Sequence, residues 1–170
     1  LDSRFLTVEH PITVGGTMLV NKNNVTCVSA LCSLWISYAV SGVLSLTANT
    51  FKSRQTSGGY AIILSNIGAS TTTMTGTVSV VGNTFMPFGA GTNCGTMMFY
   101  CSSRITSATV LIERNTMVLP TPIAECGHQR FIAFDIAIES ASTVTVRDHD
   151  FIFRHSTPYL SFFFSSAVIS

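Results

Sequence analysis

Five segments of the chain share one alternating pattern of apolar and polar positions. Each segment has two apolar residues two positions apart, a turn residue three positions later, and another bulky apolar residue two positions after that. The segments lie near residues 16–25, 42–51, 76–85, 108–117 and 142–151. Alternation of this kind is typical of a half-buried β-strand, and recurrence at such a period indicates stacked structural repeats.

A second kind of segment, a continuous apolar run, precedes four of the alternating segments and occurs once more near the end of the chain. These runs occupy residues 34–36, 62–64, 97–100, 131–134 and 162–164. Short runs rich in aromatic and β-branched residues fit strands buried in a parallel sheet. We therefore predict an all-β fold, a right-handed parallel β-helix (β-solenoid) of about five coils. Residues 1–170 would form one partial β-helix domain.

The turn position of the repeat is asparagine in the first four segments and histidine in the fifth. Equivalent positions on neighbouring coils of a β-helix lie about 4.8 Å apart. Asparagine tolerates the left-handed backbone conformation, and stacked asparagine amides can hydrogen-bond to one another along the stack. The pattern predicts a structural ladder that closes the turns, made by Asn23, Asn49, Asn83 and Asn115 and interrupted at His149.

The same alignment assigns inward and outward columns. Val80 and Val110 are predicted to be buried, and Ser79 is predicted to face solvent. Two charged pairs would meet on adjacent coils, Glu113 with Arg147 and Arg114 with Asp148. We expect these pairs to be exposed and to contribute at most about 1 kcal/mol each.

Composition supports strands and argues against several function classes. The chain is 46% apolar and only 10% charged, and residues 55–103 contain no Asp, Glu, Lys, Arg or His. A net charge of +1 lacks the basic surface that nucleic-acid binding requires. Residues 25–46 are uncharged and long enough to span a membrane, but their last third follows the register of the repeat, which favours strands.

The cysteines predict one disulfide. Cys94 and Cys126 each stand nine residues beyond a matched core position and directly before a glycine. Placed one coil apart, their Cα atoms would be about 4.8 Å from each other, within the range of a disulfide. Such a bond persists outside the cytosol. Cys27 and Cys32 could pair locally, which would leave Cys101 as a buried apolar residue.

One dense group of ionisable residues could carry chemistry. Asp148, His149 and Asp150 follow one another, and paired carboxylates are the groups that cleave polysaccharides. The equivalent positions of the neighbouring repeats supply no second carboxylate, which favours a solvated turn.

Metal and cofactor sites are not expected. Cys94, Cys126, His128 and His149 lack the spacing of a metal site, so no metal or other cofactor is predicted. Asn24-Val25-Thr26 is the one N-glycosylation sequon, and Asn24 would lie at an exposed turn.

Three stretches, residues 80–85, 94–98 and 110–115, resemble the dispersed gene family surface proteins of trypanosomatids. The resemblance extends over the whole chain and rests on the texture of the repeats. It implies very large secreted or surface proteins with β-helix-like ectodomains, membrane spans near the far C-terminus, and a role in adhesion. It supplies no catalytic residues.

These observations lead to one expected function and one alternative. We expect a non-enzymatic module of a cell-surface or secreted glycoprotein, with host-cell or matrix proteins or glycans as partners. The alternative is a carbohydrate-active β-helix enzyme that uses Asp148, Asp150 and His149. The chain begins at Leu1 without a signal peptide and ends within an apolar run, so we expect a segment of a longer solenoid. Attachment to a membrane would then depend on parts of the protein beyond this segment.

Overall fold

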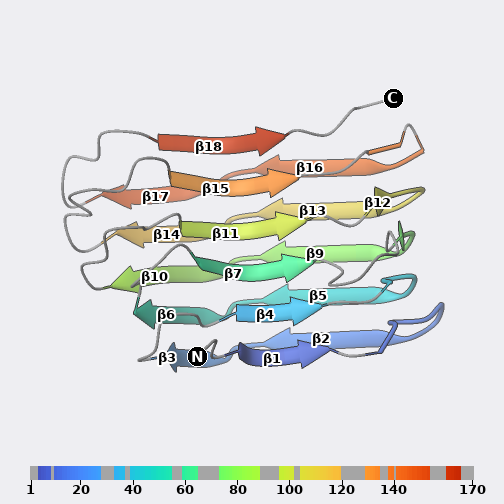
Figure 1. Cartoon of the computed structure of the whole chain (residues 1–170), viewed down its shortest axis with the longest axis horizontal. Coiled ribbons are helices and arrows are strands. Elements are labelled where there is room, and N and C mark those ends of the chain that lie inside the picture. Colours follow the sequence, from blue (N-terminus) through green and yellow to red (C-terminus); the bar gives the residue numbers. More distant parts are fainter. Residues whose placement is uncertain are drawn as a thin grey trace.

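A computed structural model describes residues 4–8, 10–27, 33–36, 39–54, 59–64, 73–88, 96–101, 104–119, 129–134, 138–139, 141–153 and 160–165. These residues form parallel strands and no helix. In Figure 1 the strands stack above one another, from the N-terminus at the bottom to the C-terminus at the top. The prediction of an all-β protein with parallel strands is confirmed, and the stacked sheets are compatible with a β-solenoid.

The predicted apolar runs all lie in one sheet, called sheet 1 here, in which neighbours along the chain are also neighbours in space. Its arrows point to the right in Figure 1. The strands, in order, are β1 (Arg4–Val8), β4 (Ser33–Ile36), β7 (Gly59–Leu64), β11 (Thr96–Cys101), β15 (Gln129–Phe134) and β18 (Leu160–Ser165).

Each alternating segment forms two short strands separated by a two-residue turn. The first strands make up sheet 2, which contains β2 (Thr17–Asn21), β5 (Val43–Thr47), β9 (Thr77–Val81), β13 (Thr109–Glu113) and β16 (Thr143–Arg147). The second strands make up sheet 3, which contains β3 (Asn24–Cys27), β6 (Thr50–Arg54), β10 (Thr84–Phe88), β14 (Thr116–Leu119) and β17 (Asp150–Phe153). Both sets of arrows point to the left in Figure 1.

A fourth, very short ladder lies between sheets 1 and 2 along the chain. It consists of β8 (Thr73–Met74) paired with β12 (Arg104–Ile105), extended by single bridges at Ile12, Val40 and Ile138. All five residues in its inward column are at most 8% exposed; they are Ile12, Val40, Met74, Ile105 and Ile138. The sequence pattern did not predict this ladder.

The predicted register between repeats is confirmed residue by residue. Val78 pairs with Leu44 on one side and Val110 on the other, without a slip. Phe85 lies between Phe51 and Met117 in the same way. The rings of Phe51 and Phe85 stack with centroids 5.3 Å apart, an arrangement that adds to the stabilisation from burial alone.

One continuous core fills the space between the sheets. It joins inward residues of sheets 1, 2 and 3 and of the short ladder. Val80 and Val110 are buried, as predicted. Ser79 is half-buried and not fully exposed, because Ser45 and Leu111 flank it on the two adjacent strands.

The left-handed residue of the turn is not the asparagine. Positive φ angles occur one position earlier, at Lys22 (56°), Ala48 (53°), Gly82 (65°), Arg114 (51°) and Asp148 (57°). The tolerance of asparagine for this conformation, given above as one reason for the asparagine column, is therefore not what places these residues at the turn. The chain bends at the preceding residue, so that the asparagine itself can direct its side chain into the buried stack.

Substitutions at this bend should change stability in opposite directions. A Cβ added at Gly82 would meet no atom within 4 Å, so Gly82→Ala should cost only the left-handed strain. That strain is roughly 1–2 kcal/mol, partly offset by the lower entropy of the unfolded alanine chain. We expect Gly82→Ala to lower, and Ala48→Gly to raise, the free energy of unfolding in urea by about 0.5–1 kcal/mol. Two changes of the same sign would contradict the assignment.

Aspartate substitutions at two neighbouring positions distinguish the inward column from the outward one. Val80→Asp places an unpaired charge in a fully buried column and should prevent folding, as measured by circular dichroism. Ser79→Asp, on the neighbouring half-buried position, should lower the free energy of unfolding by no more than about 1 kcal/mol. Equal damage from both changes would mean that the columns are misassigned.

Candidate functional site

The predicted asparagine ladder is present and mostly buried. Asn49, Asn83 and Asn115 are at most 1% exposed, whereas Asn23 is half-buried. The Nδ2 atom of each asparagine donates to Oδ1 of the next: from Asn23 to Asn49 at 3.0 Å, from Asn49 to Asn83 at 2.9 Å, and from Asn83 to Asn115 at 3.0 Å.

The buried amides use both their donors and their acceptors. Asn83 Oδ1 also accepts from the backbone N–H of Asn49 at 3.0 Å, and Asn83 Nδ2 also donates to the carbonyl of Leu46 at 2.9 Å. Asn49 and Asn115 donate to the carbonyls of Val20 and Val80 in the same way. The side chains of Asn49 and Asn83 therefore connect a repeat to the one before it and the one after it, whereas the side chain of Asn115 bonds to the repeat before it.

Removing one amide from the middle of the ladder should be costly. Asn83→Ala leaves buried groups of Leu46, Asn49 and Asn115 without their partner, at about 1–3 kcal/mol for each unsatisfied group. We expect the free energy of unfolding to fall by at least about 3 kcal/mol. Asn23→Ala is the matched control at the half-buried end, with an expected loss of about 1 kcal/mol. Similar losses at both positions, measured by urea unfolding, would argue against a cooperative ladder.

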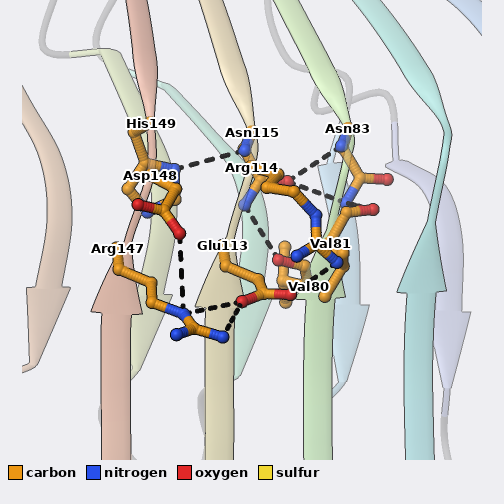
Figure 2. Close-up of polar contacts among 9 residues, drawn as sticks. All are labelled: Val80, Val81, Asn83, Glu113, Arg114, Asn115, Arg147, Asp148 and His149. Carbon is orange, nitrogen blue, oxygen red and sulfur yellow. Dashed lines mark hydrogen bonds and ion pairs between the residues drawn. The ribbon is translucent and has the colours of Figure 1, made fainter.

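His149 follows Asn115 as the fifth residue of the ladder. Figure 2 shows His149 in line with Asn115 and Asn83. Its Nδ1 atom accepts a hydrogen bond from the backbone N–H of Asn115 at 3.3 Å. Its Nε2 atom is buried and has no hydrogen-bond partner among the described residues. The ring meets Phe151 edge-on, with centroids 6.3 Å apart. Burial lowers the pKa of His149 below 6.5, against the opposing effects of the Asn115 and Ile112 backbone and the charges of Asp148 and Asp150.

A charged cluster lies next to this turn. The Glu113 carboxylate is almost completely buried and receives Nε and Nη2 of Arg147, each at 2.8 Å, through one oxygen. Its other oxygen contacts Nη2 of Arg114 at 2.5 Å. Asp148 approaches Nε of Arg147 at 3.6 Å. Figure 2 shows Arg147 between the two carboxylates.

The predicted pairing of Glu113 with Arg147 is confirmed, but two related predictions are wrong. Glu113 is buried, because the adjacent strands and two guanidinium groups cover it. Arg114 pairs with Glu113 and not with Asp148. At Arg114 the chain turns through the left-handed conformation, so its side chain no longer follows the alternation of β13.

The residues proposed for catalysis do not converge. Asp148 and Asp150 are exposed, whereas the ring of His149 turns into the ladder and uses Nδ1 there. A further acidic residue, Glu139, pairs with Arg104 at 2.5 Å. Within the described ranges, no group of three or more histidine, cysteine or acidic residues could hold a metal ion.

Several predicted site residues lie outside the described residues, namely Cys32, Cys94, Cys126 and His128. The Cys94–Cys126 disulfide therefore stays a prediction. Cys101 is fully buried, as expected of an apolar residue. Asn24 and Thr26 of the sequon are both exposed on β3, so glycosylation of Asn24 also stays a prediction.

The uncharged stretch over residues 25–46 contributes to β3, β4 and β5. Within the part of the chain that the structure describes, no helix is long and apolar enough to cross a membrane.

A second candidate surface is the outward face of sheet 2. Its first outward column is exposed along all five strands and carries no charge. The side chains stack in register and are Thr17, Val43, Thr77, Thr109 and Thr143. A regular row of hydroxyl and methyl groups, one strand spacing apart, offers both hydrogen bonds and apolar contact. The sequence pattern did not predict this row.

The chain was compared with protein-family models, curated proteins and solved structures, and it matches none of them. The resemblance to trypanosomatid surface proteins thus stays a hypothesis.

Proposed function

We propose that this chain is a segment of a right-handed parallel β-helix of about five coils that acts as a non-enzymatic interaction module. The module belongs to a cell-surface or secreted protein and contacts host-cell or matrix proteins or glycans. The right-handed sense follows from the strong preference of parallel β connections for that hand.

The observation that carries the proposal is the division of polar groups between the inside and the outside. Asn49, Asn83, Asn115 and Glu113 are buried and bind neighbouring repeats. The first outward column of sheet 2 is uncharged and regular. The buried polar groups thus serve to hold the stack together, and the exposed hydroxyl row is what remains available to a partner.

The alternative, a carbohydrate-active enzyme, has one observation in its favour. Asp148 and Asp150 are exposed on the two sides of the same turn. General acid–base catalysis needs groups that converge on one bond. Arg147 contacts Asp148, and the imidazole of His149 is held in the ladder, which makes the interaction module the better supported of the two.

A binding experiment tests the proposal. The chain is immobilised and exposed to collagen, laminin, fibronectin and a glycan array. A variant with Thr77→Glu, Thr109→Lys and Thr143→Glu disrupts the hydroxyl row with alternating charges, which attract each other across strands. We expect the unaltered chain to bind at least one probe, and the variant to bind it at least tenfold more weakly.

A second variant carries Thr→Val at the same three positions, which keeps the β-branched shape, adds no charge and removes only the hydroxyl groups, so it should also bind more weakly if those groups contact the partner. Urea unfolding of each variant separates loss of a partner from loss of the fold. No binding to any probe would contradict the module. Release of new reducing ends from a polysaccharide, abolished by Asp148→Asn, would establish the enzyme instead.

A further inference from the structure

The ladder changes its chemistry at its fifth position. An asparagine Oδ1 accepts two hydrogen bonds from the repeat before it, as Asn83 does from the backbone N–H and Nδ2 of Asn49. The imidazole of His149 accepts a single bond, from the backbone N–H of Asn115 to Nδ1. This bond requires the tautomer that carries its proton on Nε2. The contact between Asn115 and His149 therefore depends on the protonation state of the His149 ring.

Protonation removes this contact. Both nitrogens of a histidinium ion are donors, so Nδ1–H would face the N–H of Asn115, another donor. The Nε2 atom is already buried without a hydrogen-bond partner among the described residues, next to the ring of Phe151. A cation in this position would lose its hydration, and this cost outweighs the stabilisation that the Asn115 and Ile112 backbone supplies.

The charged groups around His149 favour movement toward solvent. On β13 and at its turn, Glu113 is already paired with Arg114, and it also binds Arg147 of β16. On its own segment Asp148 and Asp150 are exposed on either side of the ring. The two aspartates are thus the anions nearest to a protonated ring, and both lie on the outer side of the turn.

We propose that His149 is a pH-sensitive latch between the last two repeats. The neutral ring holds the turn between β16 and β17 against Asn115. The protonated ring leaves the ladder for the side of Asp148 and Asp150, and β16 and β17 then separate more readily from β13 and β14.

The pKa of His149 sets the range in which the latch opens. Burial lowers this pKa below 6.5 in the folded chain, so the unfolded or opened segment binds a proton more readily. The stability due to the latch is complete above about pH 6.5. It is lost as the pH falls from 6.5 toward the lower pKa of the folded state.

Hydrogen exchange of the unaltered chain at pH 7.5 and pH 5.0 tests the latch. After correction for intrinsic exchange rates, protection in β16 and β17 should fall at least fivefold more than protection in β9 and β10. The limit for one histidine is about thirtyfold, since pH 5.0 lies 1.5 units below its ordinary pKa of 6.5. The same loss in all four strands, or in none, would overturn the proposal.

Two variants assign the effect to this side chain. His149→Asn completes the ladder without a titrating group, so β16 and β17 should keep their protection at both pH values. His10→Asn is the control, because His10 is an exposed histidine outside the ladder, and the pH effect should persist in it. Persistence of the effect in His149→Asn would assign it to other groups. Nitrogen chemical shifts of the ring give an independent check at pH 7.5, where a proton on Nδ1 would contradict the latch.

Discussion

The register between successive repeats is the constraint on which the rest of this structure depends. A slip by one residue would turn every buried side chain of β9 outward. A slip by two residues would keep apolar side chains inside, so the hydrophobic pattern alone does not forbid it. Such a slip would move Asn83 away from the amides of Asn49 and Asn115 and leave buried polar groups unpaired. The ladder thus supplies the specificity that the valine columns lack.

The ladder fixes the turn region and leaves the connections free to vary. Ladder positions are separated by 26, 34, 32 and 34 residues, yet the pairing on both sides of each turn is the same. The extra residues lie in the connections; for example, Ile36 and Val40 are four residues apart, whereas Leu64 and Met74 are ten apart. The same stack of strands thus accommodates connections of different length.

The sequence predicted the columns well, because equivalent residues recur at matched positions and each repeat pairs with the next. It did not predict the geometry between columns. The bend falls at Lys22, Ala48, Gly82, Arg114 and Asp148, which share neither size nor charge. The short ladder through Val40 contributes one buried residue per repeat. A single apolar position does not produce an alternating pattern in the sequence. The burial of Glu113 depends in part on its ion pair with Arg114. Arg114 is the next residue in sequence, and strand alternation would place its side chain on the opposite face of the sheet.

The candidate site illustrates the same limit. Asp148, His149 and Asp150 form a cluster in sequence, but alternation at the turn divides them between the solvent and the ladder. The residues that depart from the repeat, His149 and the ion pairs of Glu113, occur together at the junction of the last two repeats. The earlier asparagine contacts involve no ionisable group, so their strength does not change with pH between 5 and 8. A stack of identical junctions would loosen uniformly or not at all, whereas one titratable junction allows one end to open while the others hold.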